Sequence, residues 1–220
     1  MAKNRIRGPL VTLAAVAALG GGLWWMNVSQ ETAEPPAKPV AQSATTAAPA
    51  PPPPLAPPLP VAFPAKVNYV GKIPTASGVI TLEITVNGSK AVAYACDGNT
   101  FEVWLRGSAT NGVLSLASKD KKSRLAGRPQ GNTVVGNLSI DEKNWDFTTA
   151  QVAPPAGLYV YEFDGPRSSW IVDANGGVTG VQRLADGSTA PAPGLSTDGT
   201  AVLDGRTVTV TRVEDGEDVK

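Results

Sequence analysis

The feature that most constrains the fold is a series of short segments in which apolar and polar residues alternate, separated by turn dipeptides. From Ile80 to Val86 every second residue is aliphatic, which is the period of a half-buried β-strand. Asn87-Gly88 follows directly, and both residue types tolerate the positive φ of a hairpin turn. Segments of the same kind recur at short intervals up to Phe163. The pattern predicts an all-β fold, an antiparallel meander that forms a small barrel or sandwich.

The C-terminal part of the chain continues the pattern. We assign residues 67–165 to an exported β-barrel-like domain. Residues 166–213 form further β-hairpins, which belong either to the same domain or to a small subdomain. Residues 214–220 form an acidic tail, because four of the five residues from Glu214 to Asp218 are acidic.

The N-terminus predicts a membrane anchor. Residues 9–28 form a 20-residue apolar stretch, long enough to cross a bilayer as a helix. Residues 1–8 carry Lys3, Arg5 and Arg7 and no acid, so the positive-inside rule keeps them cytoplasmic and places the rest of the chain outside. The alternative is a cleaved signal peptide, which has a shorter apolar region followed by a small-residue cleavage site.

A proline-rich segment follows the anchor. Twelve of the 20 prolines lie between Pro35 and Pro64. Proline has no backbone N–H and a fixed φ, so this stretch is expected to form neither helix nor sheet. We interpret residues 29–66 as a disordered Ala/Pro-rich stalk that holds the exported domain away from the membrane.

Composition excludes several classes of chemistry. The chain has no histidine, which removes Ser-His-Asp, Cys-His and His-metal sites. It has one cysteine, Cys96, so an internal disulfide is excluded. Lysine plus arginine and aspartate plus glutamate each number 19, and no nucleic-acid partner is expected. We therefore expect no catalytic, metal or cofactor-binding residues and no enzyme activity.

Alternation also places Cys96 in the domain. It shares a face with Val92 and Tyr94, which we expect to point into the barrel. Lone cysteines behave as small hydrophobes, so the thiol is expected to be buried. A reactive thiol or an intermolecular disulfide is the alternative.

Three sets of residues are candidate interaction sites. A dense basic patch is a candidate surface for lipid headgroups, anionic wall polymers or an acidic partner: Lys119, Lys121, Lys122, Arg124 and Arg128. Small residues at every fourth position of the anchor are a candidate helix–helix contact: Ala14, Ala18 and Gly22. Apolar residues of the first strands are candidates for an apolar pocket inside the barrel: Ile80, Leu82, Val92, Phe101 and Val103.

Acidic residues leave an enzyme of a different kind open. A wall-modifying glycosidase would need two carboxylates facing one cleft, and the domain carries several acids: Asp97, Glu102, Asp141, Glu142, Asp146, Glu162 and Asp164. Most of them lie at predicted turns, where aspartate is favoured for its hydrogen bonds to the backbone.

Short strings between residues 67 and 212 carry a resemblance. The strings Ala93-Tyr94-Ala95-Cys96-Asp97-Gly98, Val103-Trp104-Leu105-Arg106-Gly107 and Pro155-Ala156-Gly157-Leu158-Tyr159 resemble those of single-pass actinobacterial cell-envelope proteins with Ala/Pro-rich stalks and exported β-domains of unassigned function. The resemblance implies a location and an architecture, and no catalytic residues.

The leading functional prediction is a non-enzymatic binding or assembly module of the cell envelope. An accessory subunit of a membrane complex is one form that such a module takes. Its partner would be an envelope protein, a lipid or a wall polymer. The alternatives are a carrier of a lipid or small apolar ligand within the barrel and a carboxylate-dependent wall-modifying enzyme.

Overall fold

A computed structural model of the chain describes residues 61–215. The regular structure in this range consists of β-strands. Within it, no helix has the length and apolar character needed to span a bilayer. The predicted anchor, its contact residues Ala14, Ala18 and Gly22, and the stalk up to residue 60 lie outside the described residues, and so do residues 216–220 of the acidic tail.

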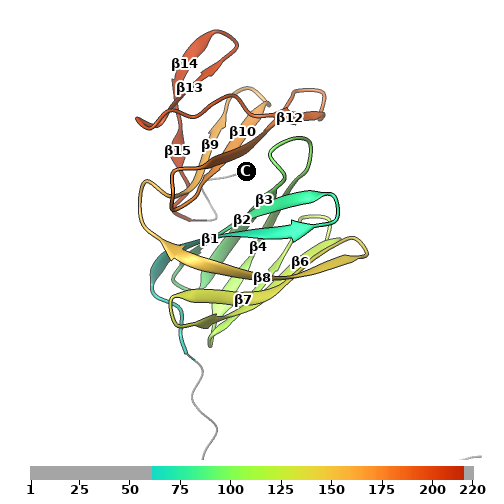
Figure 1. The fold of residues 1–220 in the computed structure, drawn as a ribbon, viewed down its shortest axis with the longest axis vertical. Coiled ribbons are helices and arrows are strands. Elements are labelled where there is room, and N and C mark those ends of the chain that lie inside the picture. Colours follow the sequence, from blue (N-terminus) through green and yellow to red (C-terminus); the bar gives the residue numbers. More distant parts are fainter. Residues whose placement is uncertain (1–60, 216–220) are drawn as a thin grey trace, which may run out of the picture. The chain divides into compact units, whose positions relative to one another are not determined.

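The first eight strands form a closed antiparallel barrel (Figure 1). Each strand pairs with the next one in sequence, and β8 closes the barrel by pairing with β1 from Asn68↔Val152 to Val70↔Ala150. The all-β prediction and the antiparallel meander are confirmed, and the meander is a barrel. Its strands are β1 (Lys66–Thr75), β2 (Gly78–Asn87), β3 (Lys90–Cys96), β4 (Glu102–Thr110), β5 (Val113–Ala117), β6 (Ser123–Gln130), β7 (Thr133–Ile140) and β8 (Lys143–Val152).

The remaining strands form a five-stranded sheet and a separate hairpin. The sheet has the order β12-β11-β10-β9-β15, and β13 pairs with β14. The barrel therefore ends at β8, and β9, which the sequence analysis grouped with the barrel, belongs to this second sheet. The strands are β9 (Gly157–Glu162), β10 (Arg167–Val172), β11 (Val178–Arg183), β12 (Thr189–Pro191), β13 (Thr200–Leu203), β14 (Arg206–Thr209) and β15 (Thr211–Arg212).

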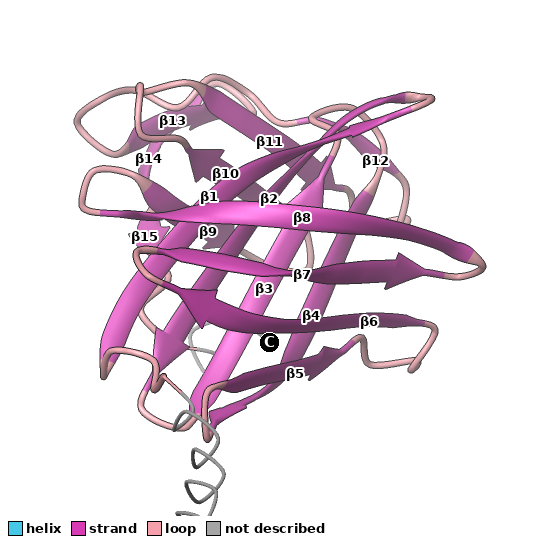
Figure 2. Ribbon diagram, turned by 60° about the horizontal axis from the view of Figure 1, so that its bottom comes forward, coloured by secondary structure: helices cyan, strands magenta, loops and turns pink. Residues whose placement is uncertain are grey.

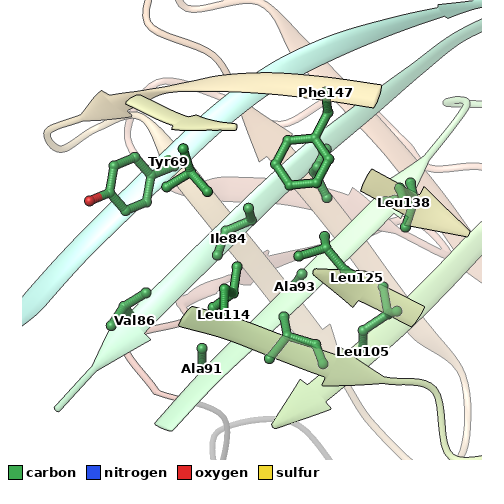
Figure 3. Packing of buried hydrophobic residues seen from close by; sticks show 14 of the residues in the cluster. Tyr69, Ile84, Val86, Ala91, Ala93, Leu105, Leu114, Leu125, Leu138 and Phe147 are labelled. Carbon is green, nitrogen blue, oxygen red and sulfur yellow. The ribbon is translucent and has the colours of Figure 1, made fainter. Parts of the chain in front are cut away.

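Apolar side chains fill the barrel as one cluster (Figure 3). Leu105, Leu114, Leu125 and Leu138 are each 0–1% exposed. Strand β3 contributes only alanines to this cluster, Ala91, Ala93 and Ala95. Small side chains on β3 leave room for the leucines that project from other strands, so the interior packs without a wide lumen.

Glycines allow neighbouring strands of the barrel to approach closely. A Cβ on Gly107 would collide with the carbonyl oxygen of Ser115, and a Cβ on Gly136 would collide with that of Ala126. Both glycines lie within strands, where a glycine commonly marks a tight bend or a close backbone contact. Gly107 and Gly136 therefore have a packing role in the barrel.

The outer face of the barrel packs against the second sheet (Figure 2). Val92, Tyr94 and Cys96 on β3 join Leu158 and Ile171 of the sheet in a second buried cluster, here called the junction. The expected inward direction of Val92, Tyr94 and Cys96 is thus corrected: they lie on the outside of the barrel. The burial of Cys96 is confirmed, since it is 0% exposed.

A buried ion network crosses the junction. Arg183 Nε and Arg167 Nη2 donate to Glu102 Oε1 at 2.8 and 3.0 Å, and Tyr94 Oη donates to Oε2 at 3.0 Å. The Glu102 side chain is only 1% exposed. The Arg167 guanidinium also lies 5.1 Å from the ring centroid of Trp104. Glu102 on the barrel therefore fixes two arginines of the sheet in place.

Candidate functional site: the mouth of the barrel

A pocket of about 930 Å³ lies at one end of the barrel and is here called the mouth. Its walls come from the β1–β2 turn, the β3–β4 loop, the β5–β6 loop and the β7–β8 turn, which an antiparallel meander places at the same end. Its size is at the upper end of the roughly 300–1,000 Å³ usual for small-molecule sites. Its apolar lining consists of Val79, Ile80, Phe101, Ile140 and Trp145.

Polar and charged side chains surround that apolar lining. They comprise two hydroxyls, two ammonium groups and three carboxylates. The acids and lysines among them are exposed. The mouth thus combines aromatic and aliphatic surface with hydrogen-bonding groups of both signs. The polar lining residues are Thr75, Ser77, Asp97, Lys122, Asp141, Glu142 and Lys143.

Backbone hydrogen bonds to Asp97 fix the β3–β4 loop. Its Oδ1 accepts from the N–H groups of Asn99, Thr100 and Phe101 at 2.8, 3.0 and 2.9 Å. This is the local hydrogen-bonding for which aspartate is favoured at turns. The arrangement presents the Phe101 ring to the mouth while its backbone is held on both sides.

The second sheet supports the same loop from outside. Thr189 Oγ1 donates to the carbonyl oxygen of Thr100, and a Cβ on Gly98 would come within 2.9 Å of Thr179 Cγ2. Lys72 and Asp173 form an ion pair at 2.8 Å between β1 and the β10–β11 turn. The sheet therefore braces one side of the mouth, which favours a preformed site.

The β5–β6 loop, which carries Lys122, is held by its own side chains. Ser118 Oγ donates to Asp120 Oδ1 at 2.6 Å, and the Ser123 N–H donates to Ser118 Oγ at 2.9 Å. The Lys122 N–H donates to Asp120 Oδ1 at 3.1 Å. The two hydrogen bonds that Asp120 accepts lower its pKa below the ordinary value, and the bond from Ser118 has the larger effect. The loop directs Lys122 to the mouth.

The chain enters the barrel at the end opposite the mouth. Strand β1 runs from Lys66 toward the β1–β2 turn at the mouth. Before it, the Ala65 carbonyl accepts from Gly88 N–H on the β2–β3 turn at 2.6 Å. Phe63 packs against the barrel core and makes an edge contact with Tyr69 at 6.4 Å. Residues 61–65 and the mouth therefore lie at opposite ends of strand β1.

Two of the five residues predicted to line an apolar pocket lie at the mouth. Ile80 and Phe101 line the mouth. Leu82 lies in the packed core, and Val103 packs against it. Val92 is on the other face of its strand, in the junction. The sequence-based assignment of Val92 to the pocket is therefore wrong, because β3 has a buried face on each side.

The predicted basic patch is distributed over two places. Lys119, Lys121 and Lys122 belong to the β5–β6 loop, and of these Lys122 lines the mouth. Arg124 and Arg128 lie four residues apart on β6, on its exposed face. All five are exposed. Lys122 and Lys143 line the same pocket, although they are 21 residues apart in the sequence.

The acids also separate into groups. Asp97, Asp141 and Glu142 line the mouth, from two different connections. Glu102 is in the junction network. Asp146 accepts from Asn137 Nδ2 at 3.2 Å on the barrel wall, and Glu162 and Asp164 belong to the β9–β10 hairpin. Within residues 61–215, no group of three or more His, Cys, Asp or Glu side chains is arranged to hold a metal ion.

Seven lining residues of the mouth were absent from the sequence-based predictions: Thr75, Ser77, Gly78, Val79, Ile140, Lys143 and Trp145. Ile140 and Trp145 are bulky apolar residues on either side of the exposed segment 141–144, which comprises the β7–β8 turn and the start of β8. Such a pair beside a polar turn is a usable signal, since large apolar side chains next to a turn must pack against something. Both are half-buried against the barrel core.

Comparison of the chain with protein-family models, with curated proteins and with solved structures finds no match.

Proposed function

We propose that this protein is a non-enzymatic binding module of the cell envelope, anchored in the cytoplasmic membrane by residues 9–28, and that it binds its ligand at the mouth of the barrel. One observation supports this most strongly. An open pocket with apolar and charged walls lies at the end of the barrel away from the chain entry. On a tethered domain, that end is free to meet an envelope component.

The packed barrel interior favours the mouth over an internal ligand. A carrier of lipid or another apolar molecule needs an unfilled lumen, and here leucine and isoleucine side chains of the core are almost fully buried against one another. A ligand of this barrel would therefore rest on the core at Ile80 and Phe101.

The roles of the acids favour binding over catalysis. Asp97 holds a loop through three backbone hydrogen bonds, and Glu102 is neutralised by two arginines. Asp141 and Glu142 are exposed and adjacent on one turn. None of these four is a buried acid facing a base across the mouth, the arrangement that general acid–base chemistry uses.

Photo-crosslinking in cells tests the proposed site. A photo-reactive amino acid is placed either at Val79, which is 48% exposed at the mouth, or at Val113, which is 55% exposed at the opposite end. We expect an envelope component to be captured from position 79 and not from position 113. Equal capture from both positions, or from neither, contradicts binding at the mouth.

Thiol labelling tests the proposed location. A Val113→Cys variant carries an exposed thiol, whereas the native Cys96 is fully buried. A maleimide that cannot cross membranes should label Val113→Cys on intact cells and leave the wild-type protein unlabelled. Labelling that requires cell lysis would contradict an exported domain.

A further inference from the structure

The side chains that line the mouth indicate which chemical groups a ligand needs there. Phe101 and Trp145 are half-buried and belong to the apolar lining of the pocket. Around them stand the carboxylates of Asp141 and Glu142 and the ammonium group of Lys143. A ligand that fills this space needs apolar faces for the rings and many hydroxyl or amide groups around its edge.

A second hollow extends the site. It has a volume of about 450 Å³ and shares Thr75, Ser77, Lys143 and Trp145 with the mouth. Asn144, an amide that both donates and accepts hydrogen bonds, is among its lining residues. Trp145 is thus common to two adjacent hollows. Such an arrangement suits an extended ligand built from repeated units.

We propose that the mouth binds an oligosaccharide segment of an envelope polysaccharide, with sugar rings against Trp145 and Phe101 and sugar hydroxyls on residues 141–144. This inference rests on the proposed function and names its ligand class. Sugar rings carry apolar C–H faces and a polar edge, which matches these walls. An acyl chain does not, because it needs an enclosed apolar space and the core already occupies the barrel.

Direct binding measurements on the full-length protein test the ligand class. The protein is placed in lipid nanodiscs, because maltoside detergents carry sugar headgroups. Chitotetraose, cellotetraose, mannotetraose and octanoate are each titrated by calorimetry, with empty nanodiscs as the blank. Three variants accompany the wild type: Trp145→Ala, the double variant Asp141→Asn with Glu142→Gln, and Phe163→Ala.

The variants are chosen to separate binding from folding. Trp145 packs against the core, so Trp145→Ala can lower stability as well as affinity. Asp141 and Glu142 are exposed, and asparagine tolerates the positive φ of 51° at position 141. The double variant should therefore fold normally. Phe163 is an aromatic residue, 66% exposed and absent from the mouth, and serves as the matched control.

We expect at least one of the three oligosaccharides to bind the wild type and Phe163→Ala equally. Both mouth variants should bind it roughly tenfold more weakly or worse, the effect of losing about one stacking contact, or of replacing two charge-assisted hydrogen bonds to carboxylates by weaker ones to neutral amides. Binding of octanoate without any oligosaccharide would overturn the inference. Oligosaccharide binding that both mouth variants retain would overturn it as well.

Failure of this inference and failure of the proposed function give different results. If no oligosaccharide binds while position 79 still captures an envelope component, the carbohydrate inference is wrong and the binding module stands. If neither is seen, both are wrong. Cleavage of a bound oligosaccharide would support the ligand class and contradict a non-enzymatic role.

Discussion

The interior of the barrel and the junction are both buried, but they are built differently. The barrel cluster, from Val67 to Phe147, consists of aliphatic and aromatic side chains. The junction combines apolar side chains such as Val92 and Ile171 with two buried acids, Glu83 and Glu102. Strands β1 and β3 contribute to both clusters, with residues on opposite faces of each strand.

The difference teaches how one small barrel carries a second sheet. Apolar packing is not directional and holds the barrel together from inside. Ion pairs and hydrogen bonds have fixed geometry, so Glu102 with Arg167 and Arg183 sets where the sheet lies on the barrel. We therefore expect the interior to determine how stable the barrel is, and the junction to respond to charge and pH.

The largest expected effect comes from the interior. Leu114 is 0% exposed within the barrel cluster. Leu114→Ala should lower the free energy of unfolding by about 3–4 kcal/mol, because it removes apolar contacts and leaves a cavity. Thermal unfolding of the full-length protein, followed by circular dichroism at several pH values, measures it. A loss that depends strongly on pH would contradict an interior held together by apolar packing.

The junction network gives the next effect. Glu102→Ala leaves Arg167, with a side chain 14% exposed, and Arg183, with 42%, without their carboxylate. We expect a loss of about 3 kcal/mol, at the lower end for a broken buried ion pair, because Arg183 keeps access to water. Glu142→Ala at the exposed turn is the control and should change stability by less than about 0.5 kcal/mol. Equal effects of the two substitutions would argue against the network.

Glu83 should make the stability of the junction depend on pH. Asn68 Nδ2 and Thr85 Oγ1 each donate to its Oε1 at 2.8 Å, and its Oε2 has no partner among the described residues. Burial raises the pKa of Glu83 from 4.5 to about 7, while these hydrogen bonds and the nearby Arg212 oppose the rise. The folded protein therefore holds this proton at pH values where the unfolded chain has released it.

The sign of the effect follows from that difference. The contribution of Glu83 to the free energy of unfolding is fully present below pH 4.5 and is lost as the pH rises to about 7. The loss amounts to about 3 kcal/mol for such a pKa difference. The difference in unfolding free energy between wild type and Glu83→Gln, measured from pH 4.5 to 8, should show it. A difference that stays constant over this range would contradict a carboxyl group buried in neutral form.

The last prediction concerns the Cys96 thiol, which should hardly react in the folded protein. Its thiol is fully buried in the junction, and burial raises the pKa of Cys96 to about 12, chiefly by desolvation. The folded protein at pH 8 should react with a thiol reagent far more slowly than the chain in denaturant does. A rate equal to that of the unfolded chain would show that the junction opens freely.

Much of the barrel could be predicted from alternation and turn residues, because one face of most strands is polar. Strand β3 could not be oriented in this way. Ala91, Ala93 and Ala95 face the interior, while the larger Val92, Tyr94 and Cys96 face the junction. Since both faces are apolar, alternation loses its information, and the larger side chains were assigned to the inside.

Of the apolar lining of the mouth, only Ile80 and Phe101 could be predicted from the sequence. Ile80 and Phe101 follow from their strands, but Lys143 and Trp145 join them through closure of the barrel between β8 and β1. Closure brings together residues about 65 positions apart, such as Ile80 and Trp145. No local pattern carries that proximity. Arg124 and Arg128 lie on the exposed face of β6 and do not line the mouth, although Lys122 is close to them in sequence.

Fluorine NMR of the full-length protein labelled with 5-fluorotryptophan tests the central claim most directly. Trp145 reports on the mouth, Trp104 on the junction and Trp170 on the buried cluster around the β13–β14 hairpin. On addition of a soluble carbohydrate fraction of the cell's own envelope, we predict that the Trp145 resonance shifts and those of Trp104 and Trp170 do not. A shift at Trp104 with Trp145 unchanged would contradict the mouth as the binding site.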